Sequence, residues 1–454
     1  MLISINPANE EKLKEYTEHN QSEINTILHQ SQESFRLWRT TSWSVRAGLM
    51  NKAAGVLRKH RDEFAVLMAT EMGKPVQAGR AEIEKCAMVC EYYAEHGESF
   101  LADQIIGSDA SKSFVAFQPL GVILAIMPWN FPFWQVFRFA APTLMAGNAG
   151  VLKHASNVTG CALAIEDVFK EAGFPEHLFR TLKLGSKQVA TVIEHPVVQA
   201  VTLTGSVPAG RAVAGKAGQM LKKTVLELGG SDPYLVLEDA DLDLAVPACV
   251  NSRLINSGQS CIAAKRFVVV ESVKDEFERR FVELMRQKKM GDPLDEQNHI
   301  GPQARNDLRD ELHQQVEESL HKGAICLLGG KIPAGKGAWY PPTVLTNVTT
   351  GMPAHDDELF GPVAAIITAK NEQDAIAIAN KSVFGLGAAV FTRDVKKGER
   401  IAARELAAGC CFVNDNVKSD PRLPFGGIKD SGYGRELSQF GIREFVNIKT
   451  VSIK

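Results

Sequence analysis

The stretch Gln199–Gly230, QAVTLTGSVPAGRAVAGKAGQMLKKTVLELGG, decides the fold class. Its pattern predicts a strand at 199–203, a helix at 209–221 and a second strand at 224–228. Two strands joined by a helix in this way normally lie parallel in one sheet, because a parallel pair needs a long crossover connection. A parallel sheet of this kind binds nucleotides at the carboxyl ends of its strands.

The same alternation continues on both sides of this stretch. Before it, the sequence predicts helices across 22–99, a strand, turn and strand across 113–127, a strand at 149–153 and a helix at 158–172. After Gly230, it predicts strands at 234–237, 267–270, 364–367 and 388–391, a helix at 274–289 and an edge strand at 444–453. We therefore expect an α/β protein with a doubly wound parallel sheet followed by a second α/β region.

The composition is that of an ordinary folded protein. The chain has 454 residues, is 45% hydrophobic and 23% charged, and carries a formal net charge of −2, so we expect no nucleic-acid partner. The N-terminus lacks the pattern of a signal peptide, and no apolar run approaches the ~20 residues that span a bilayer. The eight cysteines show no metal-type spacing. We expect a soluble, cytoplasmic protein that has no membrane partner and no metal site.

The segment Asn256–Cys261, NSGQSC, contains the first candidate for chemistry. Cys261 follows a turn-like sequence and precedes Ile262–Ala264, which is compatible with a helix. A helix N-terminus at this point would lower the pKa of the thiol and favour a thiolate nucleophile. Taken alone, a buried cysteine at a turn explains the segment at least as well.

Glu227 is the second candidate, because its carboxylate stands inside the apolar run VLELGG at 225–230. Burying a carboxylate is costly unless the group is paired or functional, and burial raises its pKa toward the range of a general base. A glutamate on a solvated strand face is the competing interpretation.

Two further motifs follow predicted strands. Asn130 in MPWNFP (127–132) carries a side-chain amide that can donate to an oxyanion, although a turn asparagine between prolines would have the same pattern. The run LTGSVPAG at 203–210 leads from a strand into a helix, where N–H groups and the Ser206 hydroxyl can hold a phosphate. This pattern alone is common.

Together with ELFGP at 358–362 and PFGG at 424–427, these motifs in this order resemble the aldehyde dehydrogenase superfamily from about residue 20 to the C-terminus. Residues 225–232, 263–267 and 425–436 are most similar to the succinate-semialdehyde dehydrogenase group in its shorter bacterial form. The resemblance implies a cofactor-binding domain (1–98 and 120–229), a catalytic domain (230–428) and a small β oligomerisation extension (99–119 and 437–454). It also implies a homodimer or homotetramer.

The resemblance assigns the catalytic roles. Cys261 attacks the aldehyde carbon, Asn130 and the Cys261 N–H hold the oxyanion, and Glu227 activates the water that hydrolyses the thioester. The cofactor is NAD or NADP. Ser156 stands where many NAD-preferring relatives have a glutamate, so nothing at that position repels the 2′-phosphate of NADP. The residues expected to contact the cofactor are Ile126, Pro128, Trp129, Lys153, Ser156, Gly205, Ser206, Glu358 and Phe360.

The implied substrate is succinic semialdehyde, whose far carboxylate calls for a cation in the pocket. Arg138, Arg253 and Ser419 are the residues expected to bind it. Three alternatives stay open: a dehydrogenase of other small or neutral aldehydes, a coenzyme A-acylating enzyme, and a catalytically silent binding or structural relative. Glu227 disfavours the second, since acyl transfer to a thiol has less need of a water-activating base.

Overall fold

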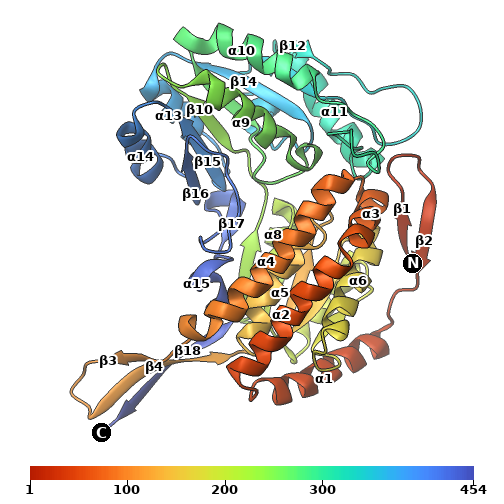
Figure 1. Ribbon diagram of the computed structural model, residues 1–454, viewed down its shortest axis with the longest axis vertical. Coiled ribbons are helices and arrows are strands. Elements are labelled where there is room, and N and C mark those ends of the chain that lie inside the picture. The colour runs from red at the N-terminus through yellow and green to blue at the C-terminus, as the bar shows by residue number, and fades with distance from the viewer.

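The computed structural model describes residues 1–454 and shows two lobes and a projecting β-arm (Figure 1). The first lobe is built on a six-stranded sheet in the order β17-β9-β8-β5-β6-β7. All neighbours are parallel except β17 and β9. The strands are β5 (Val122–Met127), β6 (Ala149–His154), β7 (Phe179–Thr181), β8 (Val198–Thr204), β9 (Lys223–Glu227) and β17 (Gly432–Tyr433).

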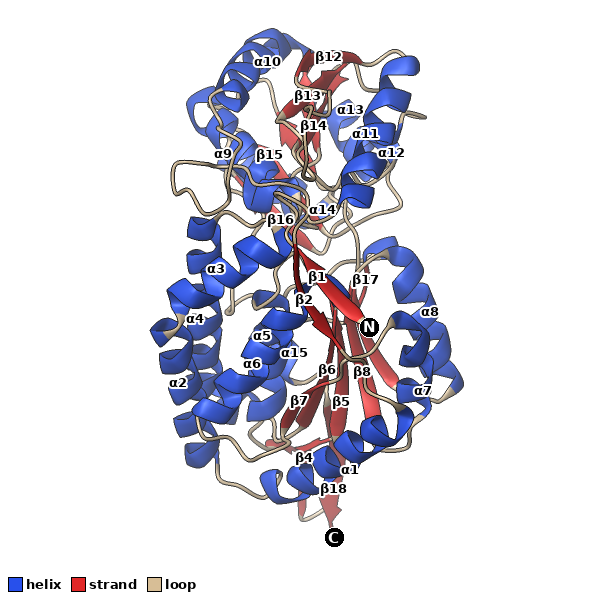
Figure 2. Ribbon diagram, turned by 90° about the vertical axis from the view of Figure 1, so that its right-hand side faces the viewer, coloured by secondary structure: helices blue, strands red, loops and turns tan.

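Helices cover both faces of this sheet, with α4 and α5 along one flank and α7 and α8 along the other (Figure 2). The helices of this lobe are α1 (Gln21–Trp38), α2 (Trp43–Lys59), α3 (Arg61–Met72), α4 (Val76–Phe100), α5 (Trp134–Met145), α6 (Thr159–Glu171), α7 (Val189–Glu194), α8 (Val207–Gln219) and α15 (Ser438–Ile442), with the short η1 (Ser156–Val158) and η2 (Ser186–Gln188). Every residue of α5 is buried, so it lacks the amphipathic pattern by which a surface helix is recognised from sequence.

The second lobe contains a seven-stranded sheet in the order β12-β13-β14-β11-β10-β15-β16, in which only β12 is antiparallel to its neighbour. Its strands are β10 (Pro233–Val236), β11 (Arg266–Val270), β12 (Ile325–Leu328), β13 (Thr343–Thr346), β14 (Val363–Ala369), β15 (Gly387–Phe391) and β16 (Cys410–Val413). Its helices are α9 (Leu242–Leu254), α10 (Glu271–Arg286), α11 (Asn306–His321), α12 (Pro353–Asp356), α13 (Glu372–Asn380) and α14 (Val395–Arg404), with η3 (Ile255–Gly258) and η4 (Lys429–Ser431).

The arm is a three-stranded antiparallel sheet in the order β18-β4-β3. It joins β3 (Gln104–Ile106) and β4 (Lys112–Pro119) to β18 (Val446–Ile453) near the other end of the chain. A separate hairpin of β1 (Leu2–Ile5) and β2 (Lys12–Tyr16) was not expected from the sequence. The predicted α/β class and parallel sheets are confirmed.

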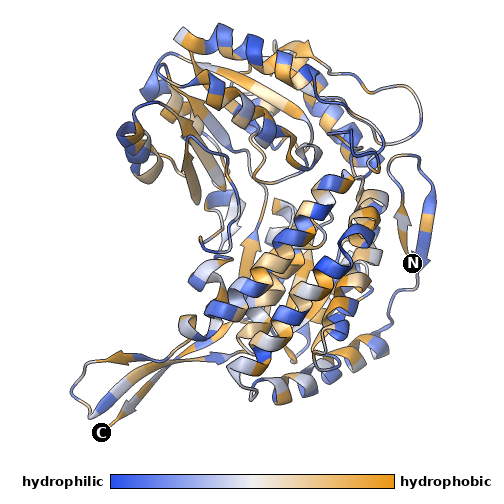
Figure 3. Cartoon of the chain, viewed as in Figure 1, coloured by the Kyte–Doolittle hydropathy of each residue, from blue (hydrophilic) through white to orange (hydrophobic).

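Apolar residues fill the strands inside both lobes, whereas polar residues mark the outward faces of α2 and α4 (Figure 3). The strands β5, β8 and β9 are buried along most of their length, as a parallel sheet covered on both faces requires. None of the helices has the length and apolar character needed to cross a membrane. This rigid sheet fixes the place where the loops after β5, β8 and β9 meet.

Candidate active site

A cavity of about 540 Å³ lies where β5, β8 and β9 end, and residues of the second lobe form its other wall. Its position agrees with the rule that open α/β sheets bind ligands at the carboxyl ends of their strands. Eight of the residues singled out from the sequence line it, namely Pro128, Trp129, Asn130, Gly205, Ser206, Cys261, Glu358 and Phe360.

The loop that carries Cys261 has an unusual backbone. Asn256, Ser257 and Gly258 all adopt positive φ angles, of 53°, 57° and 77°. Two successive non-glycine residues in this region are rare and store strain that the surrounding structure must hold. A Cβ at position 258 would collide with the backbone of Gly361, so only glycine fits there. Strain of this kind is concentrated at functional sites.

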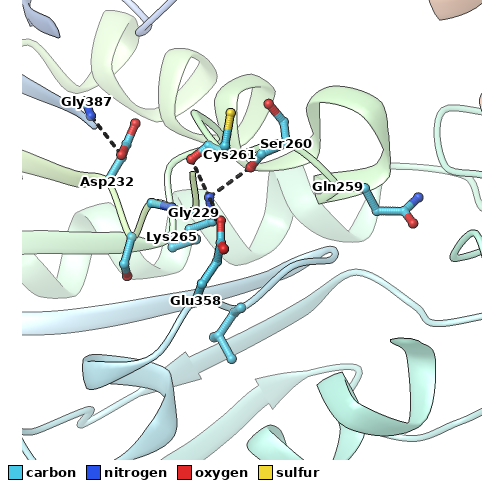
Figure 4. A network of polar contacts seen from close by, with 12 residues as sticks. Gly229, Asp232, Gln259, Ser260, Cys261, Lys265, Glu358 and Gly387 are labelled. Atoms are coloured by element: carbon cyan, nitrogen blue, oxygen red, sulfur yellow. Dashed lines mark hydrogen bonds and ion pairs between the residues drawn. The ribbon is translucent and has the colours of Figure 1, made fainter. Parts of the chain in front are cut away.

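Two buried cations hold the carbonyl groups of this loop. Arg253 donates to the carbonyl oxygen of Gly258 at 2.7 Å, and Lys265 donates to those of Ser260 and Cys261 at 2.8 and 2.6 Å. Figure 4 shows the Lys265 amine directed at both oxygens, with Glu358 beside it. Arg253 also donates to Leu359 and Val363 and is fully buried. Arg253 was expected to bind the substrate; its two terminal nitrogens donate to backbone carbonyls, its Nε has no partner, and a role in substrate binding stays a prediction.

The sequence interpretation of the Cys261 environment needs correction. No helix begins at Cys261; residues 261–263 form a turn that leads into β11, so the expected helix N-terminus is absent. Burial raises the pKa of the thiol to about 12, and the nearby charges of Lys265 and Arg138 oppose that effect only in part. Burial thus favours the thiol form of Cys261 in the free protein, and the nearby positive charges favour the thiolate that the sequence led us to expect.

Two hydrogen-bond donors belong to residues that line the same cavity, Asn130 and Cys261. The Asn130 side-chain amide donates one of its two hydrogens to the carbonyl oxygen of Gln259 at 3.1 Å, which leaves the second free. The backbone N–H of Cys261 donates no hydrogen bond within the chain. This pair of free donors has the composition of an oxyanion hole, in which N–H groups are aimed at a developing negative charge.

Glu227, the last residue of β9, is buried at 2% exposure, and neither of its carboxylate oxygens has a hydrogen-bond partner. Burial and the nearby charge of Glu436 raise its pKa well above 4.5. A Cβ at Gly426 would come within 2.7 Å of Glu227 Oε1, so the PFGG motif approaches this carboxylate at a point where only glycine leaves room. Glu227 does not itself line the cavity, whereas Leu228 and Gly229 do.

The polar groups of the cavity fit a nicotinamide dinucleotide. No side chain caps the N-terminus of α8, so its first-turn N–H groups are available to a pyrophosphate next to Gly205 and Ser206. The buried hydroxyl of Thr204, which also lines the cavity, has no partner. Across the cavity, Glu358 accepts from the Gly230 N–H at 3.1 Å and pairs with Lys265 at 3.3 Å.

Three of the expected cofactor residues lie outside the cavity. Ile126 and Lys153 are paired across β5 and β6, and Ser156 begins η1 just after β6. All three stand at the same carboxyl edge of the sheet, Ile126 on β5 and the other two on the neighbouring β6 or directly after it. Lys153 makes no ion pair, and burial lowers its pKa. An unpaired cation next to a serine suits the ribose or 2′-phosphate end of a dinucleotide.

The expected substrate residues Arg138 and Ser419 are both buried, but each already has a partner. Arg138 forms an ion pair with Glu436, and its guanidinium lies 4.7 Å from the centre of the Phe425 ring. The Ser419 hydroxyl accepts hydrogen bonds from Lys85 at 2.7 Å and from Trp134 at 3.1 Å.

The sequence profile of the aldehyde dehydrogenase family matches residues 2–451. The chain belongs to the aldehyde dehydrogenase family. Over 452 residues, all of this chain and 99% of the relative, it is 51% identical to a probable NADP-dependent succinate-semialdehyde dehydrogenase of Synechocystis sp.. It is 49% identical to the NAD(P)-dependent succinate semialdehyde dehydrogenase Sad of Escherichia coli, with 99% of this chain and 97% of the relative covered. The crystal structure of a succinic semialdehyde dehydrogenase from Streptococcus pyogenes in complex with NADP⁺ superposes with a TM-score of 0.97, full coverage of both chains and 35% identity.

In this aldehyde dehydrogenase, three charged side chains near the site had no role in the sequence interpretation. They are Lys85, Lys265 and Glu436. Lys265 was detectable, because it stands with Arg266 directly before the apolar strand FVVV, where a cation needs a partner. Lys85 and Glu436 acquire their significance only through contacts between distant parts of the chain.

Proposed function

We propose that this aldehyde dehydrogenase oxidises succinic semialdehyde to succinate with NADP or NAD. The observation that carries the chemistry is the strained loop that presents Cys261 to the cavity beside two free N–H donors. The substrate assignment is supported by relatives with that name at 49–51% identity along essentially the whole chain.

The reaction begins when the Cys261 thiol gives its proton to solvent water and the sulfur attacks the aldehyde carbon. The carbonyl oxygen becomes an oxyanion that the Asn130 amide and the Cys261 N–H stabilise. A nicotinamide cofactor, when bound, supplies the acceptor for the hydride that leaves the thiohemiacetal carbon. The acyl group then remains on Cys261 as a thioester.

Glu227 completes the reaction as a general base. Its carboxylate takes a proton from water, the hydroxide oxygen attacks the thioester carbon, and the C–S bond breaks to release the acid and the Cys261 sulfur. The raised pKa suits Glu227 to this role, because its ionised carboxylate is a stronger base than that of an ordinary glutamate. Its protonated form places no charge in the apolar interior. The same base favours hydrolysis over transfer to coenzyme A.

For the cofactor, we propose that Gly205 and Ser206 hold the pyrophosphate and that Glu358 holds the nicotinamide ribose. Phe360 packs near the nicotinamide ring and is in edge contact with Trp129, with ring centres 5.7 Å apart. Pro128 and Ile126 complete the groove. Lys153 and Ser156 bind the adenosine ribose, and the absence of an acid at position 156 permits a 2′-phosphate there.

We also propose three domains close to those expected from the sequence, with α15 (Ser438–Ile442) in the first lobe and the β-arm as the oligomerisation extension of a homodimer or homotetramer. The arm exposes four isoleucines, Ile105, Ile106, Ile448 and Ile453, and an exposed apolar edge favours pairing with another subunit. A cytoplasmic location is supported by the eight cysteines, all of which are free.

The experiment that tests the proposed function compares initial rates with succinic semialdehyde and butyraldehyde, each with NADP and with NAD. The two aldehydes share their chain length and differ in the terminal carboxylate. We expect kcat/KM to be at least about 100-fold higher for the charged aldehyde. A charge-assisted hydrogen bond between its carboxylate and a buried cation stabilises the bound substrate by about that factor. Equal or higher values for butyraldehyde would leave an aldehyde dehydrogenase whose substrates are neutral.

A further inference from the structure

A buried ion pair lies next to the loop that carries Asn130. Glu82 of α4 and Lys74, which precedes that helix, are 4% and 1% exposed and pair with each other. The Lys74 ammonium group also lies 3.9 Å from the centre of the ring of Phe131, the residue after Asn130. A buried ion pair carries a desolvation cost that apolar residues of similar size would avoid, so stability alone is a weak reason for this pair.

Glu82 caps α5, the helix that follows the Asn130 loop. Its Oε1 atom accepts hydrogen bonds from the backbone N–H groups of Phe133 and Trp134, each at 2.9 Å. The N-cap residue of α5 supplies no side-chain cap of its own. The Glu82 carboxylate therefore satisfies N–H groups that helix geometry leaves free, and its charge suits the positive end of the helix dipole. The backbone that leads from Asn130 into α5 is fixed by this carboxylate.

The segment before α4 also supports the loop on the other side of Asn130. A Cβ at Gly73 would come within 2.7 Å of the Pro302 ring, so the two residues are in close contact. The carbonyl oxygen of Pro302 accepts from the Gln259 side chain at 3.3 Å. The backbone carbonyl oxygen of Gln259 in turn accepts from the Asn130 amide at 3.1 Å. Both ends of the Asn130 hydrogen bond are thus held from this region of the first lobe.

The Asn130 side chain has few other restraints. Its Oδ1 atom is buried without a hydrogen-bond partner, and its Nδ2 atom donates only to Gln259 within the chain. The direction of its free N–H therefore depends on the position of its backbone. An oxyanion donor must lie about 2.7–3.1 Å from the developing charge. A displacement of about 1 Å can cost about 100-fold in rate.

We propose that Glu82 is a positioning residue for the oxyanion donor Asn130, and that Lys74 holds its carboxylate against the start of α5. Glu82 does not line the cavity that Cys261 lines, so it acts through Asn130 and not on the substrate. This proposal rests on the proposed function, because Asn130 needs a fixed position only if an oxyanion forms at Cys261. Without the carboxylate, two buried N–H groups would need other acceptors, and the loop before them would move.

The test compares two variants that lack both charges of the pair, Lys74→Met/Glu82→Gln and Lys74→Met/Glu82→Leu. Glutamine keeps an oxygen that accepts from α5, whereas leucine has none, and removing both charges avoids an unpaired buried charge. Values of kcat and KM are measured with succinic semialdehyde, butyraldehyde and NADP. With each aldehyde, we expect kcat of the leucine variant to be about 10- to 100-fold below that of the glutamine variant. KM for the aldehydes and for NADP should change by less than about threefold.

A double-mutant cycle distinguishes positioning from a general loss of stability. Both variants are also made with Asn130→Ala, in which the position of the amide no longer matters. In that background, leucine and glutamine at position 82 should give kcat values within about threefold of each other. Glu82→Asp keeps the charge but withdraws the oxygens, and its loss of about 3- to 10-fold should likewise disappear with Asn130→Ala. Glu95→Ala, at an exposed site of α4, is the control and should keep the wild-type kcat.

The outcomes separate this inference from the proposed function. Equal kcat in the glutamine and leucine variants, or an undiminished difference with Asn130→Ala, would overturn the role of Glu82 and leave the proposed function standing. If the leucine variant does not fold, the cycle of Glu82→Asp with Asn130→Ala decides in the same way. A wild type that oxidises butyraldehyde but not succinic semialdehyde would contradict the proposed function, and the butyraldehyde rates would then decide the role of Glu82.

Discussion

The side-chain amide of Asn130 donates a hydrogen bond to the carbonyl oxygen of Gln259 at 3.1 Å, so the loop after β5 holds the loop that carries Cys261. Asn256 strengthens the same junction, because its amide donates to the carbonyl oxygens of Asn130 at 2.6 Å and Gln259 at 3.1 Å. The two lobes are thus joined at the point where the nucleophile and its oxyanion donors meet.

Replacing Asn130 by alanine removes one oxyanion donor and one tether of the loop. We expect kcat to fall by about 100- to 1000-fold with a much smaller change in KM, because the lost contact forms fully only in the transition state. Steady-state kinetics with succinic semialdehyde measure this effect. Asn256→Ala is the matched control, since it removes loop tethers without removing an oxyanion donor. Equal losses in the two variants would mean that Asn130 acts only as a tether.

The raised pKa of Cys261 predicts how its reactivity depends on pH. Because the pKa is about 12 in the free protein, the thiolate is a minor species at neutral pH and grows as pH rises. The rate of inactivation by iodoacetamide should therefore increase by about tenfold per pH unit between about pH 7 and 10, without a plateau. Peptide mass spectrometry assigns the alkylated residue. A plateau at or below about pH 9 would show that the thiol ionises more readily than its burial implies.

The pair Glu436 and Arg138 tunes the base. The charge of Glu436 raises the pKa of Glu227, and that of Arg138 lowers it. Glu227 must be ionised to act as a base, so hydrolysis is lost as pH falls through its raised pKa. Glu436→Gln removes the repulsion and frees Arg138, and both changes lower that pKa. The acid limb of the pH profile of kcat should move to lower pH in this variant. Glu95→Gln, at an exposed site of α4, should leave it in place. A shift to higher pH contradicts the assignment.

Position 156 sets the tolerance for the 2′-phosphate of NADP. Ser156→Glu places a carboxylate next to Lys153, where it repels the phosphate and accepts from the ribose hydroxyl of NAD. We expect kcat/KM for NADP to fall by about 100-fold, with a change of less than about tenfold for NAD. Initial rates with both cofactors measure the ratio, and Ser22→Glu on α1 is the surface control. An unchanged ratio of kcat/KM for NADP to that for NAD would show that Ser156 does not contact the cofactor.

Much of this molecule follows from local sequence pattern. The strands and helices around Gln199–Gly230 are predictable because apolar residues recur with the period of each element. The burial of Glu227 is predictable as well, since it stands within an apolar run, and the structure confirms it. Only the folded chain reveals that its carboxylate has no hydrogen-bond partner and that Gly426 approaches it closely.

The remaining features depend on contacts that the local sequence pattern does not show. Ile262–Ala264 is compatible with a helix, but the carbonyls before it are bound by Lys265 and the chain enters β11. Arg253 is an arginine, the residue that best binds a carboxylate, but its guanidinium donates hydrogen bonds to the carbonyl oxygens of Leu359 and Val363. Arg138 meets Glu436 only because α5 packs beside the C-terminal segment. Lys85 is an ordinary helix lysine until α5 and the 415–422 loop surround it.

The central claim is that succinic semialdehyde is oxidised on Cys261 and released by the base Glu227. It is tested most directly by mixing the Glu227→Gln variant with succinic semialdehyde and NADP, quenching in acid and determining peptide masses. We expect a burst of NADPH that is stoichiometric with the sites, and one succinyl group on the peptide that contains Cys261. A burst without an acylated cysteine, an acyl group on another residue, or wild-type turnover without accumulation would contradict the claim.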